Sequence, residues 1–341
     1  MASYRITKNT KEIFMSQSAR WIRWIRMLII FVTIFLAGCT GIKHSLYEKA
    51  MNYERNKAGL CLKTIEVNGK TISLMESERG KKKPTIVLVH GFAANKENWI
   101  RFAAYLTDAY YVVAMDLPGH GESVKDFNLR YGYRDQVGYV NEILTQLNIK
   151  KFHMAGNSMG GAISALYAVA YPEQVQSLFL IDPAGIHRYD CELNRCLARG
   201  ENPLIVTCDK DFYRLMDFAL EDKPFIPWPI ASVMAEKAIA NEAINKKIFA
   251  DFHGECTYSF EDEIKKIIVP AFILWGAEDR VIDVKNASIF DQLIPHSQVV
   301  ILEGVGHASM IEAPEKSAKI YMDFIDSLPL PGKKECFQPG P

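Results

Sequence analysis

One serine lies in a sequence pattern that is typical of nucleophiles in acyl transfer. Ser158 is at the centre of residues 156–160, Gly-Asn-Ser-Met-Gly, directly after a short apolar segment. A Gly-x-Ser-x-Gly pattern between a strand and a helix predicts a sharp turn that exposes the serine hydroxyl. Few residues other than glycine fit beside the serine, because the strand and the helix approach closely there. We therefore interpret Ser158 as a nucleophile that attacks a carbonyl carbon.

A serine hydroxyl needs a base to remove its proton, and the base needs an acid that fixes its tautomer. Asp279 and His307 each follow an apolar, strand-like segment, in the chain order serine, acid, histidine that such a sheet requires. We predict that Asp279 is the acid and His307 the base. Asp283, in the same loop, and Asp182, after another predicted strand, are the alternatives for the acid.

The negative oxygen that forms during acyl transfer needs two backbone N–H donors. The residue after the nucleophile, Met159, is expected to supply one of them. The loop at residues 90–93 is expected to supply the other from Phe92. His90 is interpreted as a brace for this loop. This chemistry requires neither a metal ion nor an organic cofactor.

Apolar runs alternate with helical patterns along most of the chain. The predicted strands are residues 62–67, 70–76, 85–89, 111–115, 152–155, 178–181, 271–275 and 299–302. Apolar spacing near 3.6 predicts helices at 98–106, 133–147 and 161–170. The first two strands flank Asn68-Gly69, a hairpin turn signal. This alternation predicts an α/β fold with a mostly parallel, doubly wound sheet.

The alternation stops after the sixth predicted strand. Residues 187–267 contain helical patterns and a proline-rich segment, 224–229, but no clear strand. We interpret them as a helical cap inserted into a core formed by 61–186 and 268–330. Four cap residues either line an acyl groove or form the core of the cap; they are Phe212, Leu215, Phe225 and Trp228. Residues 331–341 are interpreted as a C-terminal tail.

Composition excludes some classes of partner. The 341 residues are 49% hydrophobic with a formal net charge of zero, so no basic face for nucleic acid is indicated. Six cysteines besides Cys39 allow several disulfide pairings, and the spacing of Cys191, Cys196 and Cys208 favours a local bridge. No Cys-x-x-Cys motif or histidine pair accompanies them, which argues against zinc.

The N-terminal 38 residues resemble a bacterial lipoprotein signal peptide. Three arginines precede the apolar run 27–35, which is too short to span a bilayer, and Leu-Ala-Gly-Cys ends at Cys39. The resemblance implies export, cleavage before Cys39 and acylation of that cysteine. Thr40 after it, instead of aspartate, favours the outer membrane. Residues 39–60 would then be a tether. Alternatives are an uncleaved anchor or a secreted protein, and Met15 is an alternative start.

Several motifs together resemble the α/β-hydrolase superfamily across residues 62–330. They are His-Gly-Phe at 90–92, Asp-Leu-Pro-Gly-His-Gly at 116–121, Gly-Asn-Ser-Met-Gly-Gly at 156–161, Trp-Gly-x-x-Asp at 275–279 and Gly-His at 306–307. The serine-centred motif is similar to those of bacterial lipases and membrane-anchored monoacylglycerol lipases. It also occurs in C–C bond hydrolases of aromatic degradation.

An exported, membrane-attached enzyme meets lipids and external esters. We therefore expect a carboxylester hydrolase, a lipase or esterase, that acts on acylglycerol-like lipid esters through an acyl-enzyme intermediate. A C–C bond hydrolase or a haloperoxidase-like enzyme is the alternative within this fold. The alternative that is not an enzyme is a non-catalytic surface lipoprotein.

Overall fold

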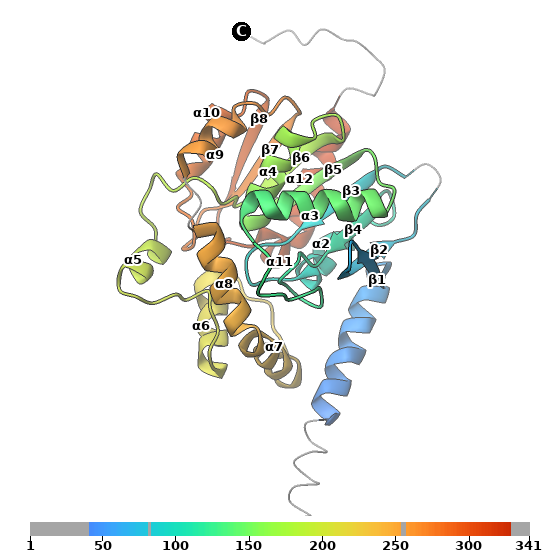
Figure 1. Cartoon of the computed structure of the whole chain (residues 1–341), viewed down its shortest axis with the longest axis vertical. Helices are drawn as coiled ribbons and strands as arrows, with labels where there is room; N and C mark the ends of the chain where they lie inside the picture. The colour runs from blue at the N-terminus through green and yellow to red at the C-terminus, as the bar shows by residue number, and fades with distance from the viewer. Residues whose placement is uncertain (1–40, 81–82, 254–256, 329–341) are drawn as a thin grey trace, which may run out of the picture.

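The computed structural model describes residues 41–80, 83–253 and 257–328 of the chain (Figure 1). Eight strands form one sheet in the order β1-β2-β4-β3-β5-β6-β7-β8. The strands are β1 Leu60–Val67, β2 Lys70–Ser77, β3 Thr85–Val89, β4 Tyr111–Met115, β5 Phe152–Asn157, β6 Val175–Ile181, β7 Ala271–Gly276 and β8 Ser297–Leu302. β2 pairs antiparallel with β1 and β4, and the strands from β4 to β8 pair in parallel.

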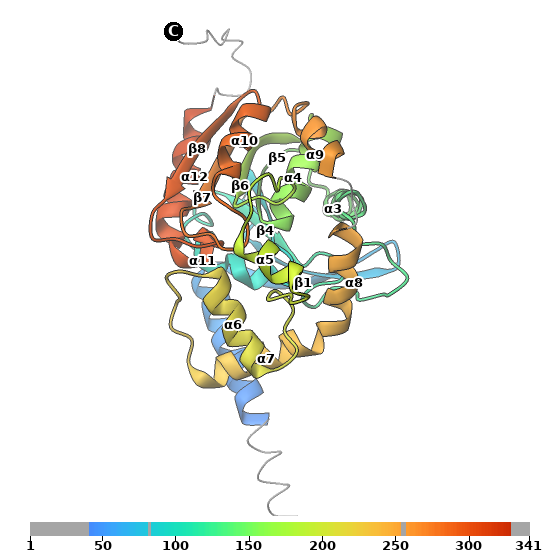
Figure 2. The ribbon, with the colours of Figure 1, turned by 90° about the vertical axis from the view of Figure 1, so that its left-hand side faces the viewer.

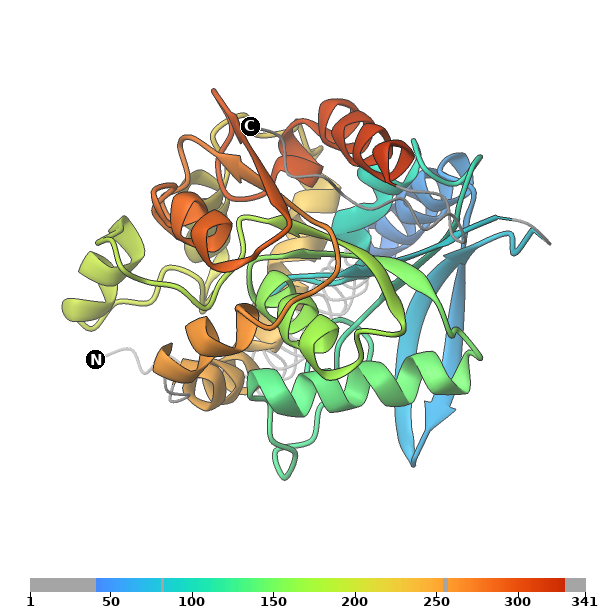
Figure 3. The same cartoon turned by 90° about the horizontal axis from the view of Figure 1, so that it is seen from above.

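Helices cover both faces of this sheet, which confirms the predicted fold class (Figure 3). The core helices are α2 Ile100–Ala103, α3 Tyr133–Gln146, α4 Met159–Ala170, α10 Asn286–Leu293, α11 Ser309–Glu312 and α12 Pro314–Ser327, with a 3₁₀ turn η1 Lys96–Trp99. β4 and β5 are buried along their whole length, and four of the five residues of β3 are buried. Strands enclosed on both faces need apolar residues at every position, which explains the continuous apolar runs.

A helix at residues 41–57 leads into the β1–β2 hairpin, where Asn68 and Gly69 take positive φ angles of 50° and 74°. Tyr47 and Arg55 of this helix are buried. Arg55 donates a hydrogen bond to Glu97 of η1 over 2.6 Å. The helix therefore packs on the core. Within the described ranges, no helix is both long enough and apolar enough to cross a membrane. Cys39 and residues 1–38 lie outside them.

In the part of the chain that the structure describes, five helices lie between β6 and β7 (Figure 2). They are α5 Glu192–Ala198, α6 Asp209–Ala219, α7 Trp228–Ala240, α8 Glu242–His253 and α9 Thr257–Ile264. Residues 228–253 form two helices, α7 and α8, that meet at Asn241. Together with α6 they form a cap beside the sheet, whereas α9 packs on α4 of the core. Phe212 is buried against Val206, Ala231 and Ala235, and Leu215 packs against the same cluster. These two residues therefore form the core of the cap.

The expected disulfide bridge is wrong for the cysteines that the structure describes. Cys61, Cys191, Cys196 and Cys208 all carry free thiols. The buried Cys191 Sγ instead donates to the carbonyl oxygen of Val281 over 3.0 Å. Cys208 is exposed at the start of α6. The Cys196 Sγ accepts from Arg199 over 3.4 Å, so each of the two buried thiols has a hydrogen-bond partner of its own instead of a bridge. Cys256 and Cys336 lie outside the described residues.

Candidate active site

Ser158 occupies a strained turn between β5 and α4. Its φ and ψ angles are 55° and −120°, outside the regions that residues with a side chain normally adopt. The surrounding hydrogen bonds hold this conformation. The Ser158 N–H donates to Ile181 over 3.0 Å, and its carbonyl accepts from Gly161 and Ala184 over 2.9 Å each. Such a rigid, strained turn is a common feature of functional sites.

The glycines of the motif are required by close packing. A Cβ atom on Gly156 would lie 2.2 Å from the carbonyl oxygen of Gly160, and one on Gly160 would lie 2.2 Å from that of Val89. Both contacts are with backbone atoms, which have little freedom to move. The spacing of the glycines thus follows from how closely α4 approaches β5 and the end of β3.

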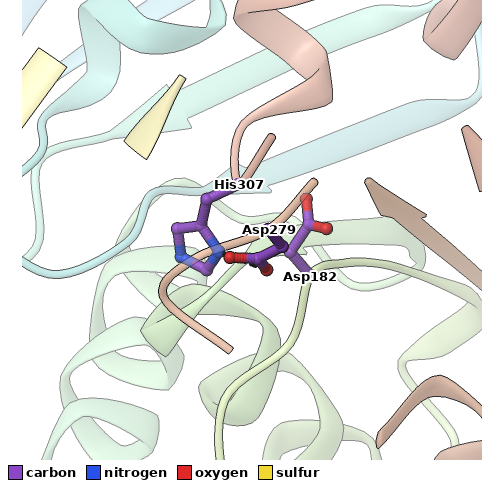
Figure 4. A group of neighbouring side chains, drawn as sticks. All are labelled: Asp182, Asp279 and His307. Atoms are coloured by element: carbon purple, nitrogen blue, oxygen red, sulfur yellow. Dashed lines mark hydrogen bonds and ion pairs between the residues drawn. The ribbon is translucent and has the colours of Figure 1, made fainter. Parts of the chain in front are cut away.

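Asp279 and His307 lie in contact beyond the ends of β7 and β8 (Figure 4). The His307 Nδ1 atom is 2.8 Å from Asp279 Oδ2. Asp279 also accepts from the N–H groups of Val281 and Ile282 over 2.8 and 3.0 Å, and from Trp275 Nε1 over 3.1 Å. Because four donors surround it, the Asp279 side chain is held in one position and can orient the imidazole.

The backbone of His307 is hydrogen-bonded both to the turn at Ser158 and to the cap. Asn157, next to the serine, donates from Nδ2 to the His307 carbonyl over 3.0 Å, and the His307 N–H donates to Ala219 at the end of α6 over 2.8 Å. Across the described residues, no hydrogen bond joins Ser158 Oγ to the His307 ring. Hydrogen bonds between nucleophile and base often form fully only with substrate bound. The structure thus joins the acid to the base and places the base loop beside the serine.

The two alternative acids lie in different places. Asp283 accepts from the N–H of Lys285 over 2.9 Å at the start of α10. Asp182 is fully buried near Asp279 and His307, and one carboxylate oxygen of each aspartate and one ring nitrogen of His307 lie within 4.8 Å of one another. In the part of the chain that the structure describes, no other such group of His, Cys, Asp or Glu is close enough to hold a metal ion. We interpret Asp182, Asp279 and His307 as an acid–base group and not as a metal site, because His307 and Asp279 are already hydrogen-bonded to each other.

The loop after β3 lies against the nucleophile. A Cβ atom on Gly91 would lie 3.2 Å from Ser158 Cβ. Within the described residues, no hydrogen bond occupies the N–H groups of Phe92 and Met159, the two predicted donors to the oxyanion.

His90 braces this loop, because its Nε2 accepts from the Leu117 N–H over 3.0 Å and its Nδ1 lies 2.7 Å from the Gly91 carbonyl. Burial lowers the pKa of His90 to about 4, so the ring stays neutral near pH 7.

An apolar cavity of about 390 Å³ lies beside Ser158. Its walls combine core and cap residues, among them Phe92, Tyr133, Met159, Leu166, Phe249, Phe252, Phe260 and Ile282. The four cap residues proposed from the sequence are not among them. Phe225 and Trp228 are 86% and 70% exposed, whereas Phe212 and Leu215 lie in the cap core. Sequence analysis missed Phe249 and Phe252 of α8. Their spacing of three residues places them on one face of a helix, but Phe212 and Leu215 of α6 have the same kind of spacing.

Comparison with known proteins agrees with this geometry. The alpha/beta hydrolase fold family matches residues 84–200 and 228–314. The chain is 32% identical over 308 residues to "Lipase 1" of Psychrobacter immobilis, covering 87% of this chain and 96% of that protein. It is 29% identical over 313 residues to "Monoacylglycerol lipase ABHD6" of Bos taurus, covering 88% and 91%.

A solved structure, described as that of a membrane phospholipase A and a novel bacterial virulence factor, is also similar. It has 38% sequence identity and a TM-score of 0.82, covering 89% of this chain and 98% of the other. The family match, the similar lipases and the similar solved structure all indicate the same class of enzyme. The chain belongs to the α/β-hydrolase fold family, and it is an ester hydrolase of the lipase and esterase type.

Proposed function

We propose that this enzyme hydrolyses lipid esters of the acylglycerol type through an acyl-enzyme formed on Ser158. The apolar cavity that opens beside Ser158 carries this proposal, because its aromatic and aliphatic walls fit an acyl chain. The two lipases with about 30% identity over most of the chain support the same substrate class.

In the proposed reaction, Ser158 Oγ attacks the ester carbonyl carbon while His307 Nε2 takes its proton. The N–H groups of Phe92 and Met159 stabilise the oxyanion. His307 then protonates the leaving alcohol, and a water molecule, deprotonated by the same ring, releases the fatty acid and regenerates the serine. Asp279 holds the ring and stabilises its positive charge through the 2.8 Å hydrogen bond.

The test combines labelling with a substrate panel. A fluorophosphonate probe is expected to label Ser158, and Ser158→Ala should lower kcat on nitrophenyl esters by about 10⁶. Glycerides and nitrophenyl esters of increasing chain length should be turned over, whereas a vinylogous diketone should not. Retention of most ester turnover by Ser158→Ala would rule out the mechanism. Turnover of the diketone alone would support C–C bond hydrolysis instead.

We further propose that Cys39 is acylated and attaches the exported enzyme to a membrane. The basic and apolar segment before it supports this proposal, as does the short connection from Cys39 to the helix at 41–57. More than one acyl chain is needed for stable attachment, at about 0.8 kcal/mol per buried CH₂. Intact mass spectrometry of the native protein should find diacylglycerol and acyl groups on Cys39. A mass without them would contradict the proposal.

A further inference from the structure

Asp182 is a buried carboxyl group that the proposed reaction does not use. It directly follows β6, it is fully buried, and its φ angle of 45° lies in the left-handed region. Its Oδ1 accepts from the Gly276 N–H over 2.8 Å. Its Oδ2 has no hydrogen-bond partner among the described residues. A buried carboxylate with a single donor is costly, so this group requires an explanation.

The neighbour of Asp182 is the carboxylate that faces the base. One carboxylate oxygen each of Asp182 and Asp279 and one ring nitrogen of His307 lie within 4.8 Å of one another (Figure 4). Two carboxylates this close do not both ionise readily, and the one with fewer donors takes the proton. Asp279 has four donors and Asp182 has one. The proton therefore belongs on Asp182.

The charged surroundings agree with this assignment. Burial is the main cause that raises the pKa of Asp182 well above its usual value, and the charges of Asp279 and, less strongly, Glu312 add to it. The Gly276 N–H acts in the opposite direction. The His307 ring is the other titratable group beside it.

Asp182 also holds the backbone from which the acid and the base extend. Gly276 is the last residue of β7, three positions before Asp279. The His307 loop crosses directly over it, since a Cβ atom on Gly276 would lie 1.9 Å from the carbonyl oxygen of Gly306. The hydrogen bond from Gly276 to Asp182 thus fixes the point where these two loops meet.

We propose that Asp182 is a positioning residue whose carboxyl group carries a proton and holds the end of β7, so that Asp279 alone presents negative charge to His307. The proposal rests on the role of His307 as base in the proposed function. A neutral group here avoids a second negative charge beside the hydrogen-bonded Asp279 and His307 pair.

The experiment compares Asp182→Asn with Asp182→Ala. The measured quantity is the rate at which a fluorophosphonate labels Ser158 as a function of pH, since this rate depends on the base and not on lipid ester turnover. Asparagine is neutral and can still accept from the Gly276 N–H. The labelling rate of Asp182→Asn should therefore stay within about twofold of the parent, and the fall of this rate on the acid side of the pH profile (the acid limb) should occur at the same pH. Alanine cannot accept, and its rate should fall about tenfold.

Two results of this comparison would overturn the proposal. If Asp182 were ionised, Asp182→Asn would move the acid limb down by about one pH unit, because the base would lose a stabilising negative charge. If Asp182→Ala labelled like the parent at every pH, the residue would not position the base.

Infrared spectroscopy of the parent tests the proton itself. The C=O band of a protonated carboxylic acid should be present at neutral pH and absent from Asp182→Asn. Absence of the band from the parent would overturn the proposal even if the alanine variant failed to fold. Failure of the parent to label at Ser158 would count against the proposed function, and the infrared result would still decide the state of Asp182.

Discussion

Asp279 is distinguished from the other carboxylates of its loop by its donors. Replacing it with asparagine places an amide where the His307 Nδ1–H needs an acceptor, so the ring should turn or adopt the wrong tautomer. We expect Asp279→Asn to lower kcat by about 10⁴ on a nitrophenyl ester. Asp283→Asn is the matched control, because the Asp283 side chain accepts from the Lys285 N–H at the start of α10 and, within the described residues, has no hydrogen bond with His307. Equal losses in the two variants would contradict the assignment of the acid.

His120 makes the stability of the fold depend on pH. Burial, and then the neighbouring His90, lower its pKa to about 3, well below the usual histidine value of 6.5. The unfolded chain therefore binds a proton below pH 6.5 that the native protein does not. The contribution of His120 to the free energy of unfolding is fully present above pH 6.5 and is lost as the pH falls towards 3.

The test is His120→Phe. Its Nε2 has no partner among the described residues, and the Pro118 carbonyl that its Nδ1 contacts also accepts from Gln136 Nε2 over 3.1 Å. Between pH 7 and pH 5 the parent should lose about 2 kcal/mol more stability than the variant. Urea unfolding at both pH values measures the difference. An equal loss in both proteins would show that His120 does not bind the extra proton.

Replacing a glycine by alanine should have opposite effects on stability in helices α4 and α3. Gly160→Ala would place Cβ 2.2 Å from the Val89 carbonyl oxygen, and we expect it to destabilise the fold by about 3 kcal/mol or more. Gly138 lies within α3, and a Cβ atom added to it would have no atom within 4 Å outside its own helix turn. Gly138→Ala should stabilise the fold by about 0.5–1 kcal/mol. Thermal unfolding of the two variants gives both signs, and a stable Gly160→Ala protein would contradict the close packing.

The strands and the turn at Ser158 could be predicted because local rules determine them. Fully enclosed strands such as β4 need unbroken apolar runs, and the glycines around Ser158 are required by packing within a short stretch of chain. Asp279 and His307 could be located for a related reason, since parallel strands end at one edge of the sheet. Their hydrogen bond then follows from the topology.

The cap could not be predicted in the same detail. Phe212 and Phe249 are both phenylalanines on the apolar face of a cap helix, and the sequence does not distinguish them. Phe212 nevertheless fills the cap core, whereas Phe249 lines the cavity. Which of them faces Ser158 depends on how α6, α7 and α8 pack on one another. The sequence identifies Asp182 only as an alternative acid, because its missing hydrogen-bond partner and its distance from Asp279 are properties of the folded chain.

The helix at 41–57 contacts both the core and the cap. Arg55 binds Glu97 of η1, while Lys43 and His44 contact Glu236 of α7. Lys237 of α7 lies 4.5 Å from the centre of the Tyr47 ring. The cap is therefore held from two sides, by the sheet and by this helix.

The Arg55–Glu97 pair allows this contact to be tested. Both side chains are largely buried, at 5% and 15% exposure, so removal of Arg55 takes away the cation that is hydrogen-bonded to Glu97 and leaves Lys96 at 3.8 Å. Arg55→Met should lower the free energy of unfolding by about 3 kcal/mol, and the double variant with Glu97→Met should recover most of the loss. Chemical unfolding measures both. No loss in the single variant would show that the helix contributes little to the fold.

The helix at 41–57 has a mechanical consequence. At 1.5 Å per residue it is about 25 Å long, and its contacts with core and cap prevent it from swinging. If residue 41 were attached to a surface, this helix would be a stiff arm between the surface and the β1–β2 hairpin, whereas a flexible linker would let the core approach or leave the surface freely. The cavity beside Ser158 would then reach only those ester groups that the arm brings within range.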